Sequence, residues 1–343
     1  MKMTKRKTGW AIFAASLLLL GSETSLTAAQ GAAYNFWKSF FPAMLPFFLL
    51  GPYLAGEDAQ RAFGRLFGRA LPGLFGVPGE GAGAVLCGWI AGTPAGALGC
   101  ARAGQGMRQG EYARMCLVSC GLSPAFLITT VGEGTLGRTE AGWMLFAAQG
   151  FALIAAGLLL RRWEPVCAIE RRGESAAAQG DIFLSALANM GKVLCWMVVF
   201  AVAGALAEEW LGGLVPGWLL APALEISGGA ARLAQAPLEE DARLIALAAC
   251  AGFGGLCVQL QCAQACGLPL RVLFAGKALH GLLGAGAMWA MLHAEELLRW
   301  PTVRADPFTA GTLCALLLAA LAFCLGRARG NKKESGAGQS PAG

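Results

Sequence analysis

The chain has 343 residues, of which 56% are hydrophobic and only 14% are charged, whereas a soluble domain carries roughly 25% charged residues. This composition excludes a disordered protein, a coiled coil and a nucleic-acid-binding protein with a basic face. We therefore expect an all-α, polytopic integral membrane protein. Its 49 glycines are about twice the usual share, and they need a reason of their own because lipid-facing helices favour Leu and Ile.

Ten apolar runs follow one another along the chain, separated by charged or Pro/Gly-rich connectors. The first run follows four basic residues and predicts either a retained transmembrane anchor or a signal-like helix cleaved near Ala28-Ala29. A retained helix is favoured because many spans follow. The runs lie at about 9–28, 34–55, 81–101, 112–131, 141–160, 181–206, 214–232, 243–266, 270–292 and 307–326.

The distribution of Lys and Arg predicts the topology. If every run crossed the membrane once, the basic connector 102–114 would lie opposite the basic N-terminus, against the positive-inside rule. If 81–101 and 214–232 are instead re-entrant, both termini and most basic residues become cytoplasmic. We therefore expect a bundle of about eight transmembrane helices with two re-entrant or broken segments. Full spans at these two places remain the alternative.

In this topology, the order span, re-entrant segment, span, span occurs twice with opposite orientation. This indicates an inverted repeat, as in many secondary transporters, although a chance rhythm of helices would look the same. The expected organisation is an anchor or signal-like helix at 1–33, a first repeat at 34–160, a cytoplasmic linker at 161–180, a second repeat at 181–326 and a basic, disordered cytoplasmic tail at 327–343.

Two segments with Gly or Pro lie inside runs of the first repeat. Around Thr93, Pro94 and Gly96, the sequence predicts a broken helix, because freed backbone groups are tolerated in a membrane only where protein or water supplies partners. Broken helices also direct their N-termini at anionic solutes. The alternative is close packing of small residues. Ser123 and Pro124 predict either a kinked span or a hydroxyl that faces a ligand.

The second repeat carries polar residues inside its own apolar runs. An intramembrane carboxylate such as Glu225, close to Ser227, is a functional-site hypothesis by default. It can carry a coupling proton or cap a half-helix, unless it merely contacts water at the interface. Gln259 and Gln261 fall on different helical faces, so at most one faces a common site unless the helix unwinds at Gly254 and Gly255, just before them.

Lys277 and His280 lie one turn apart within an apolar run. They could neutralise an anionic solute or relay a proton, since His titrates near neutral pH. The alternative is a structural pair bonded to backbone carbonyls. Lys192, near the start of a span, is either a further interior cation or a side chain that extends to the interface.

The sequence contains no recognisable enzyme motif, neither a Walker A loop, a dinucleotide fingerprint, H-E-x-x-H nor G-x-S-x-G. We therefore expect no enzymatic activity and no cofactor. The pairs Cys116/Cys120 and Cys262/Cys266 have a helical spacing that could hold a metal. Small buried thiols are favoured instead, because most cysteines lie inside apolar runs.

These segments, in this order, resemble the YlbJ-type sporulation integral membrane proteins, which are grouped with the nucleoside-recognition or Gate-domain proteins. The resemblance covers roughly residues 30–325. Leu98, Gln259 and Lys277 replace a Lys, a His and an Arg of the family pattern, so the solute can differ. The matching segments are Phe41-Pro42 with Leu45 to Phe48, Gly92 to Ala97 (S-G-Y-P-x-G-A-K), Ser123-Pro124 (T-S-N-P), Leu224 to Gly229 (F-E-I-T-x-G), Gly252 to Gln261 (G-F-S-G-L-S-V-H-A-Q) and Lys277 to Gly281 (R-x-L-H-G).

The resemblance implies a role in endospore formation, at the outer forespore membrane, in the delivery of dipicolinic acid. We therefore predict a transporter of a small polar or anionic solute whose partners are that solute and the lipid bilayer, with no nucleic acid; a homo-oligomer is left open. The alternatives are a non-transporting scaffold of the spore envelope and a transporter of a nucleoside-like solute. The predicted solute site comprises Thr93, Pro94, Gly96, Ser123, Pro124, Glu225, Ser227, Gln259, Gln261, Lys277 and His280.

Overall fold

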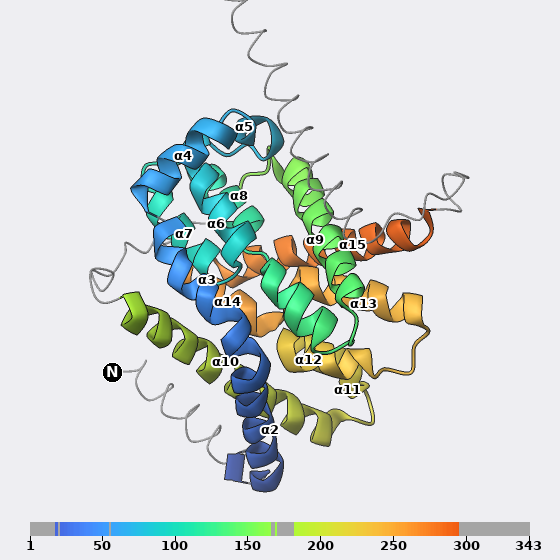
Figure 1. Ribbon diagram of the computed structural model, residues 1–343. Helices are drawn as coiled ribbons and strands as arrows, with labels where there is room; N and C mark the ends of the chain where they lie inside the picture. Colours follow the sequence, from blue (N-terminus) through green and yellow to red (C-terminus); the bar gives the residue numbers. More distant parts are fainter. Residues whose placement is uncertain (1–17, 20, 55, 166–168, 170–181, 295–343) are drawn as a thin grey trace, which may run out of the picture.

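The computed structural model describes residues 18–19, 21–54, 56–165, 169 and 182–294 (Figure 1). Within these ranges every regular element is helical and no strand occurs, which confirms the predicted all-α class there. The predicted span at 307–326 and tail at 327–343 lie outside the described residues, as do most of the linker at 161–180 and part of the run at 9–28.

Four helical stretches are long and apolar enough to cross a membrane. They are α9 (Thr139–Leu160), α10 (Ile182–Leu211), α15 (Leu270–Leu292) and the stretch Glu240–Cys266, which consists of α13 (Glu240–Phe253) and α14 (Gly255–Cys266). Each matches a predicted span. At 1.5 Å per residue, α9 is about 33 Å long, comparable to the hydrocarbon core of a bilayer. The chain is therefore an integral membrane protein.

The N-terminal part differs from the expected pattern. Two runs separated by a connector at 29–33 are predicted, but α2 (Ser22–Asn35), the π-helix η1 (Phe36–Phe40) and α3 (Phe41–Leu54) follow one another without a gap. The polar connector remains helical because it is rich in Ala and contains no Pro. Both α2 and α3 pack along α10.

An amphipathic helix follows, as the spacing of its arginines predicts. In α4 (Glu57–Phe67), Arg61 and Arg65 are exposed, whereas Phe63 and Phe67 pack against a buried apolar cluster. Two short elements, α5 (Leu71–Leu74) and the 3-10 turn η2 (Gly79–Gly81), come next. In Figure 1, α4 and α5 lie at one end of the molecule and α2 lies at the other.

Two pairs of short helices form hairpins. The first comprises α6 (Ala82–Ala91) and α7 (Ala95–Ala103), and the second comprises α11 (Gly217–Leu224) and α12 (Ile226–Ala234). In each pair the two arms pack against one another. The hairpins turn at Gly92-Thr93-Pro94 and at Glu225, where the sequence predicts broken segments.

Each hairpin is followed by an interrupted helix and then by a long span. After the first hairpin, α8 (Gln109–Ser119) and the π-helix η3 (Phe126–Glu133) are separated by the non-helical residues 120–123 and the helical residues 124–125, and α9 follows. After the second, α13 and α14 are separated at Gly254, and α15 follows. Gly254 has φ +76°, a left-handed conformation that glycine adopts without strain. The same sequence of elements therefore occurs twice.

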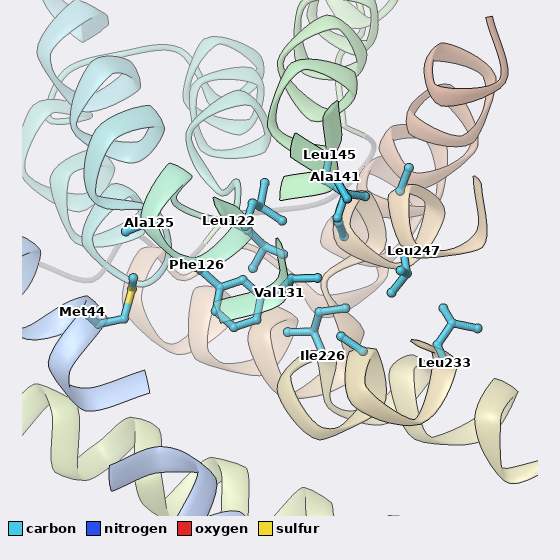
Figure 2. Packing of buried hydrophobic residues seen from close by; sticks show 14 of the residues in the cluster. Met44, Leu122, Ala125, Phe126, Val131, Ala141, Leu145, Ile226, Leu233 and Leu247 are labelled. Carbon is cyan, nitrogen blue, oxygen red and sulfur yellow. The ribbon is translucent and has the colours of Figure 1, made fainter. Parts of the chain in front are cut away.

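The interrupted helices and the long spans enclose two apolar clusters, one with buried residues of η3, α9, α10 and α13 and the other with those of α8 and α14. Figure 2 shows part of the first cluster, with Phe126, Val131 and Ile226 lying between η3 and α12. The long spans approach each other closely at glycine: Gly252 of α13 and Gly281 of α15 leave no room for a side chain, because a Cβ on Gly252 would lie 2.7 Å from the Gly281 Cα. Close packing of small residues therefore accounts for part of the glycine excess.

Two glycines of α15 provide a matched test of this contact. A Cβ on Gly281 would lie 2.7 Å from the Ala249 carbonyl oxygen, whereas one on Gly286 would meet nothing within 4 Å. We expect Gly281→Ala to reduce the free energy of unfolding by about 1–3 kcal/mol through overpacking. Gly286→Ala should be neutral or stabilising by up to about 1 kcal/mol through helix propensity. Thermal unfolding in detergent measures both; equal effects would contradict the packing described.

Candidate functional site

A small cavity with both apolar and polar walls lies where the interrupted elements meet. Its volume is about 30 Å³, which gives room for about two water molecules. Its apolar walls include Phe40 of η1, Met44 of α3, and Val193 and Met197 of α10. The remaining walls include several polar side chains. The polar lining residues are Thr93, Ser123, Glu225, Ser227, Cys257 and Gln261.

Four helices begin at this cavity. Thr93 lies two residues before α7, Ser123 lies three residues before η3, Glu225 is the N-cap of α12, and Cys257 lies in the first turn of α14. Each helix N-terminus carries unpaired N–H groups and about half a positive charge. Their convergence adds positive potential to the cavity without any cationic side chain in its walls, while the N–H groups of Ser227, Gly228 and Phe126 already donate to Glu225 and Ser123.

Glu225 caps one of these helices and is itself buried, with only 6% of its surface exposed. Its Oε1 accepts a hydrogen bond from Ser227 N and its Oε2 accepts one from Gly228 N, both at 2.7 Å. Among the described residues that line the cavity, none is Lys, Arg or His. Within the cavity walls the carboxylate is therefore balanced by helix N-termini, of which that of α12 binds it directly.

Ser123 and Thr93 connect the cavity to the interruptions of the first half. The Ser123 Oγ accepts a hydrogen bond from Phe126 N at 3.1 Å, which caps η3, and lies 3.3 Å from the Met44 Sδ. The Thr93 backbone N–H donates to the Gly121 carbonyl at 3.0 Å. This bond ties the turn of the first hairpin to the interruption between α8 and η3.

Three predicted site residues support the backbone rather than line the cavity. Pro94 is the N-cap of α7, and Gly96 lies so close to α8 that a Cβ would be 2.3 Å from the Ser119 carbonyl oxygen. Pro124 is half-buried and is the first helical residue after Ser123, in the turn that continues into η3. None of these three residues lines the cavity.

The two glutamines of α14 have different environments. Gln261 lines the cavity, and its Nε2 lies 3.2 Å from the Cys257 Sγ. Gln259 is buried outside the cavity walls, and its Nε2 donates to the Phe253 carbonyl at 3.1 Å. Gln259 therefore satisfies a carbonyl at the end of α13, where the helix breaks.

Lys277 and His280 also lie outside the cavity walls, each with 2% of its surface exposed. The Lys277 Nζ donates to the Cys120 carbonyl at 2.6 Å and lies 3.3 Å from the His280 Nδ1. The His280 Nε2 lies 3.2 Å from the Gln149 carbonyl oxygen. A neutral imidazole that accepts at Nδ1 and donates at Nε2 satisfies both contacts. The pair thus contacts backbone carbonyls, as the alternative of a structural pair predicts. Lys192 is exposed on α10.

The structure adds Gln149, which the sequence analysis missed. This residue of α9 is buried, and its Nε2 donates to the Leu122 carbonyl at 2.8 Å. Lys277 and Gln149, from the two long spans that pack together, therefore hold two carbonyls of the same interruption. The signal in the sequence is a single polar side chain inside the apolar run 141–160.

Comparisons with known proteins identify a distant homologue. Over 154 residues, the chain is 28% identical to the sporulation integral membrane protein YlbJ of Bacillus subtilis (strain 168). The aligned region covers 44% of this chain and 38% of that protein, so the chain matches well under half of its relative's length. No family model matches the chain, and no solved structure matches it significantly. The alignment confirms the resemblance to YlbJ that the sequence motifs indicate.

Replacing the amide of Gln149 tests whether the interruption depends on this donor. Gln149→Glu preserves the shape of the side chain but replaces the donor with a buried carboxylate that faces the Leu122 carbonyl. We expect a loss of about 3 kcal/mol or more at neutral pH. The loss should shrink at acidic pH, because a protonated carboxyl can again donate to the carbonyl.

The matched control is Gln109→Glu, a change at the exposed first residue of α8, where we expect an effect within about 0.5 kcal/mol. Thermal unfolding in detergent across pH measures both variants. Equal stabilities, or a Gln149→Glu defect that grows toward acidic pH, would show that the amide does not hold the Leu122 carbonyl.

Proposed function

We propose that this chain is a membrane transporter of a small polar or anionic solute, and that the solute is dipicolinate during sporulation. The observation that carries the proposal is the convergence of four helix N-termini and five polar predicted residues on one cavity. The similarity to a protein named for sporulation supports the cellular setting. The outer forespore membrane and the cytoplasmic location of both termini are part of the proposal.

The lengths of the hairpin arms support re-entrant segments. The arms α6 and α7 contain 10 and 9 residues and are therefore about 15 Å long, half of the hydrocarbon core of about 30 Å. Each hairpin thus enters the membrane to about its midplane and returns to the side that it left. With the two hairpins counted this way, the expected eight spans and two re-entrant segments remain the favoured topology.

The packing of corresponding elements supports two repeats of opposite orientation. The second arm of each hairpin packs on the later part of the other half's interrupted helix, α7 on α14 and α12 on η3. The last spans of the two halves, α9 and α15, pack on each other, and the N-terminal helices pack on α10. Transporters built from inverted repeats bind their solute near the midplane, between the repeats.

The size of the cavity indicates which state of the transporter the structure represents. Sites for small organic molecules usually have about 300–1,000 Å³, whereas this cavity has about 30 Å³. We therefore assign the structure to a closed state. Movement of one repeat against the other would widen the cavity toward one side of the membrane at a time.

A nucleoside-like solute is the second candidate, and the charge of the cavity favours it. Glu225 lies in the cavity without a cationic neighbour in the walls, and the rings of Phe40 and Phe126 lie beside it. A carboxylate accepts hydrogen bonds from neutral hydroxyl groups, and aromatic rings contact a base. Competition of unlabelled uridine against labelled dipicolinate distinguishes the two solutes.

A scaffold without transport activity is the remaining alternative. It requires that the Gly and Pro breaks serve packing and that the polar residues face bulk water. Gly281 and Gly96 do serve packing, but Ser123 and Glu225 are buried and share one cavity. Shared burial of polar side chains favours the transporter.

Filling the cavity tests the proposed function. In Ser123→Leu, the larger side chain would occupy the space at the end of the interruption and remove the cap of η3. We expect sporulating cells that carry the unmodified chain to accumulate dipicolinate in their spores, and cells that carry the variant to accumulate at least tenfold less. Uptake of labelled dipicolinate into liposomes that contain the purified protein should fall equally.

The matched control is Ser185→Leu, on α10 outside the cavity walls, which should behave as the unmodified chain does. Variant levels in the membrane are compared by immunoblot. Undiminished uptake by a normally inserted Ser123→Leu protein would exclude this cavity as the solute site.

A further inference from the structure

Glu225 is an acidic side chain in the path of an anion. It lines the cavity, it is 6% exposed, and each of its carboxylate oxygens accepts one backbone N–H of α12. The N-termini that favour an anionic solute therefore already hold a negative charge of the protein. An anion that enters meets a like charge at close range, inside a membrane, where such repulsion is weakly screened.

The groups around Glu225 do not offset this repulsion. From α14, the Cys257 thiol faces it. On α12, Arg232 forms an ion pair with Glu208 of α10 and is thereby engaged elsewhere. From α10, the residues that reach the cavity are Val193 and Met197, both apolar.

The other elements packed against α12 carry their charges at their ends. On η3 the charged residue is Glu133, the last of the helix. The charged residues of α13 are Glu240, Asp241 and Arg243, all in its first turn, and Glu240 pairs with Arg138. The buried cation Lys277 of α15 donates to the Cys120 carbonyl and does not line the cavity.

A proton removes the conflict. When Glu225 is protonated, its charge is neutralised, its hydroxyl can donate to a solute carboxylate, and the N–H groups at the start of α12 become available to the anion. When the anion leaves, the carboxylate regains the two N–H groups that it binds in this structure. Solute and proton therefore bind to the site together. When the solute leaves, the carboxyl group loses its proton and binds the two N–H groups again.

We infer that Glu225 is the site of a coupling proton, so that each anionic solute crosses the membrane together with one proton. This inference rests on the proposed transport function and names the coupling ion of the same cavity. Protonation of the carboxylate is reversible, and no bond of the solute is formed or broken.

The test uses the full-length chain in liposomes with radiolabelled dipicolinate as the probe. The membrane voltage is clamped at zero with K⁺ and valinomycin, and protein-free liposomes give the background. With the outside acidic, one proton per solute supports accumulation of about tenfold per pH unit of gradient. A protonophore should abolish this accumulation.

Two variants assign the proton to Glu225. Uptake by Glu225→Gln, which keeps one acceptor for the α12 N–H groups but cannot ionise, should not respond to the pH gradient. Glu225→Asp, which keeps the carboxylate, should restore the response. Calorimetry of dipicolinate binding in two buffers of different ionisation enthalpy should show uptake of about one proton by the unmodified chain, and none by Glu225→Gln.

The outcomes separate this inference from the function on which it rests. Uptake that ignores the pH gradient, or that requires Na⁺ instead, would overturn the proton site and leave transport intact. An equal response of Glu225→Gln and the unmodified chain would overturn the assignment to Glu225. Dipicolinate uptake no higher than in protein-free liposomes would overturn the proposed function, and the inference with it.

Discussion

The structure depends on one constraint: backbone groups freed where a membrane helix is interrupted need partners, because an unpaired group in hydrocarbon costs several kcal/mol. The carbonyl ends receive side-chain donors. Lys277 binds the Cys120 carbonyl, Gln149 binds that of Leu122, and Gln259 binds that of Phe253. Two of these donors come from the long spans α15 and α9, so the uninterrupted helices hold the interrupted ones. The breaks can therefore persist inside the membrane without unfolding the bundle.

The N–H groups freed at the same breaks face the cavity instead of being bound by side chains of the long spans. This difference creates the candidate site. In the cavity, Ser123 caps η3 and Glu225 caps α12. Carbonyls are thus bound by donors outside the cavity, whereas N–H groups converge on it and add positive potential beside the Glu225 carboxylate. A transporter can use this arrangement because solute groups replace the caps transiently. The carbonyl supports can stay in place throughout.

Much of this arrangement could be predicted from the sequence, because Gly, Pro and an intramembrane carboxylate are strong local signals. The break at Gly92 is an example, and unwinding at Gly254 and a capping role for Glu225 were among the alternatives that the sequence left open. The backbone carbonyls that Lys277 and His280 contact could not be predicted. In a helix surrounded by other helices, apolar residues occupy every face, so periodicity does not indicate which way a polar side chain points. Gln149 was missed for the same reason. The glycine excess has two causes, interruption at Gly254 and close packing at Gly281.

The central claim is that the interruptions enclose a space that opens to water and solute, and thiol modification tests it most directly. Cys257 lines the cavity, whereas Cys262, five residues later on α14, is buried in the apolar core away from it. After treatment of native membranes with a small, membrane-impermeant thiol reagent, mass spectrometry locates the modified residues. The account predicts that Cys257 reacts faster than Cys262 and that dipicolinate slows the reaction. Equal rates at the two thiols, unaffected by dipicolinate, would contradict it.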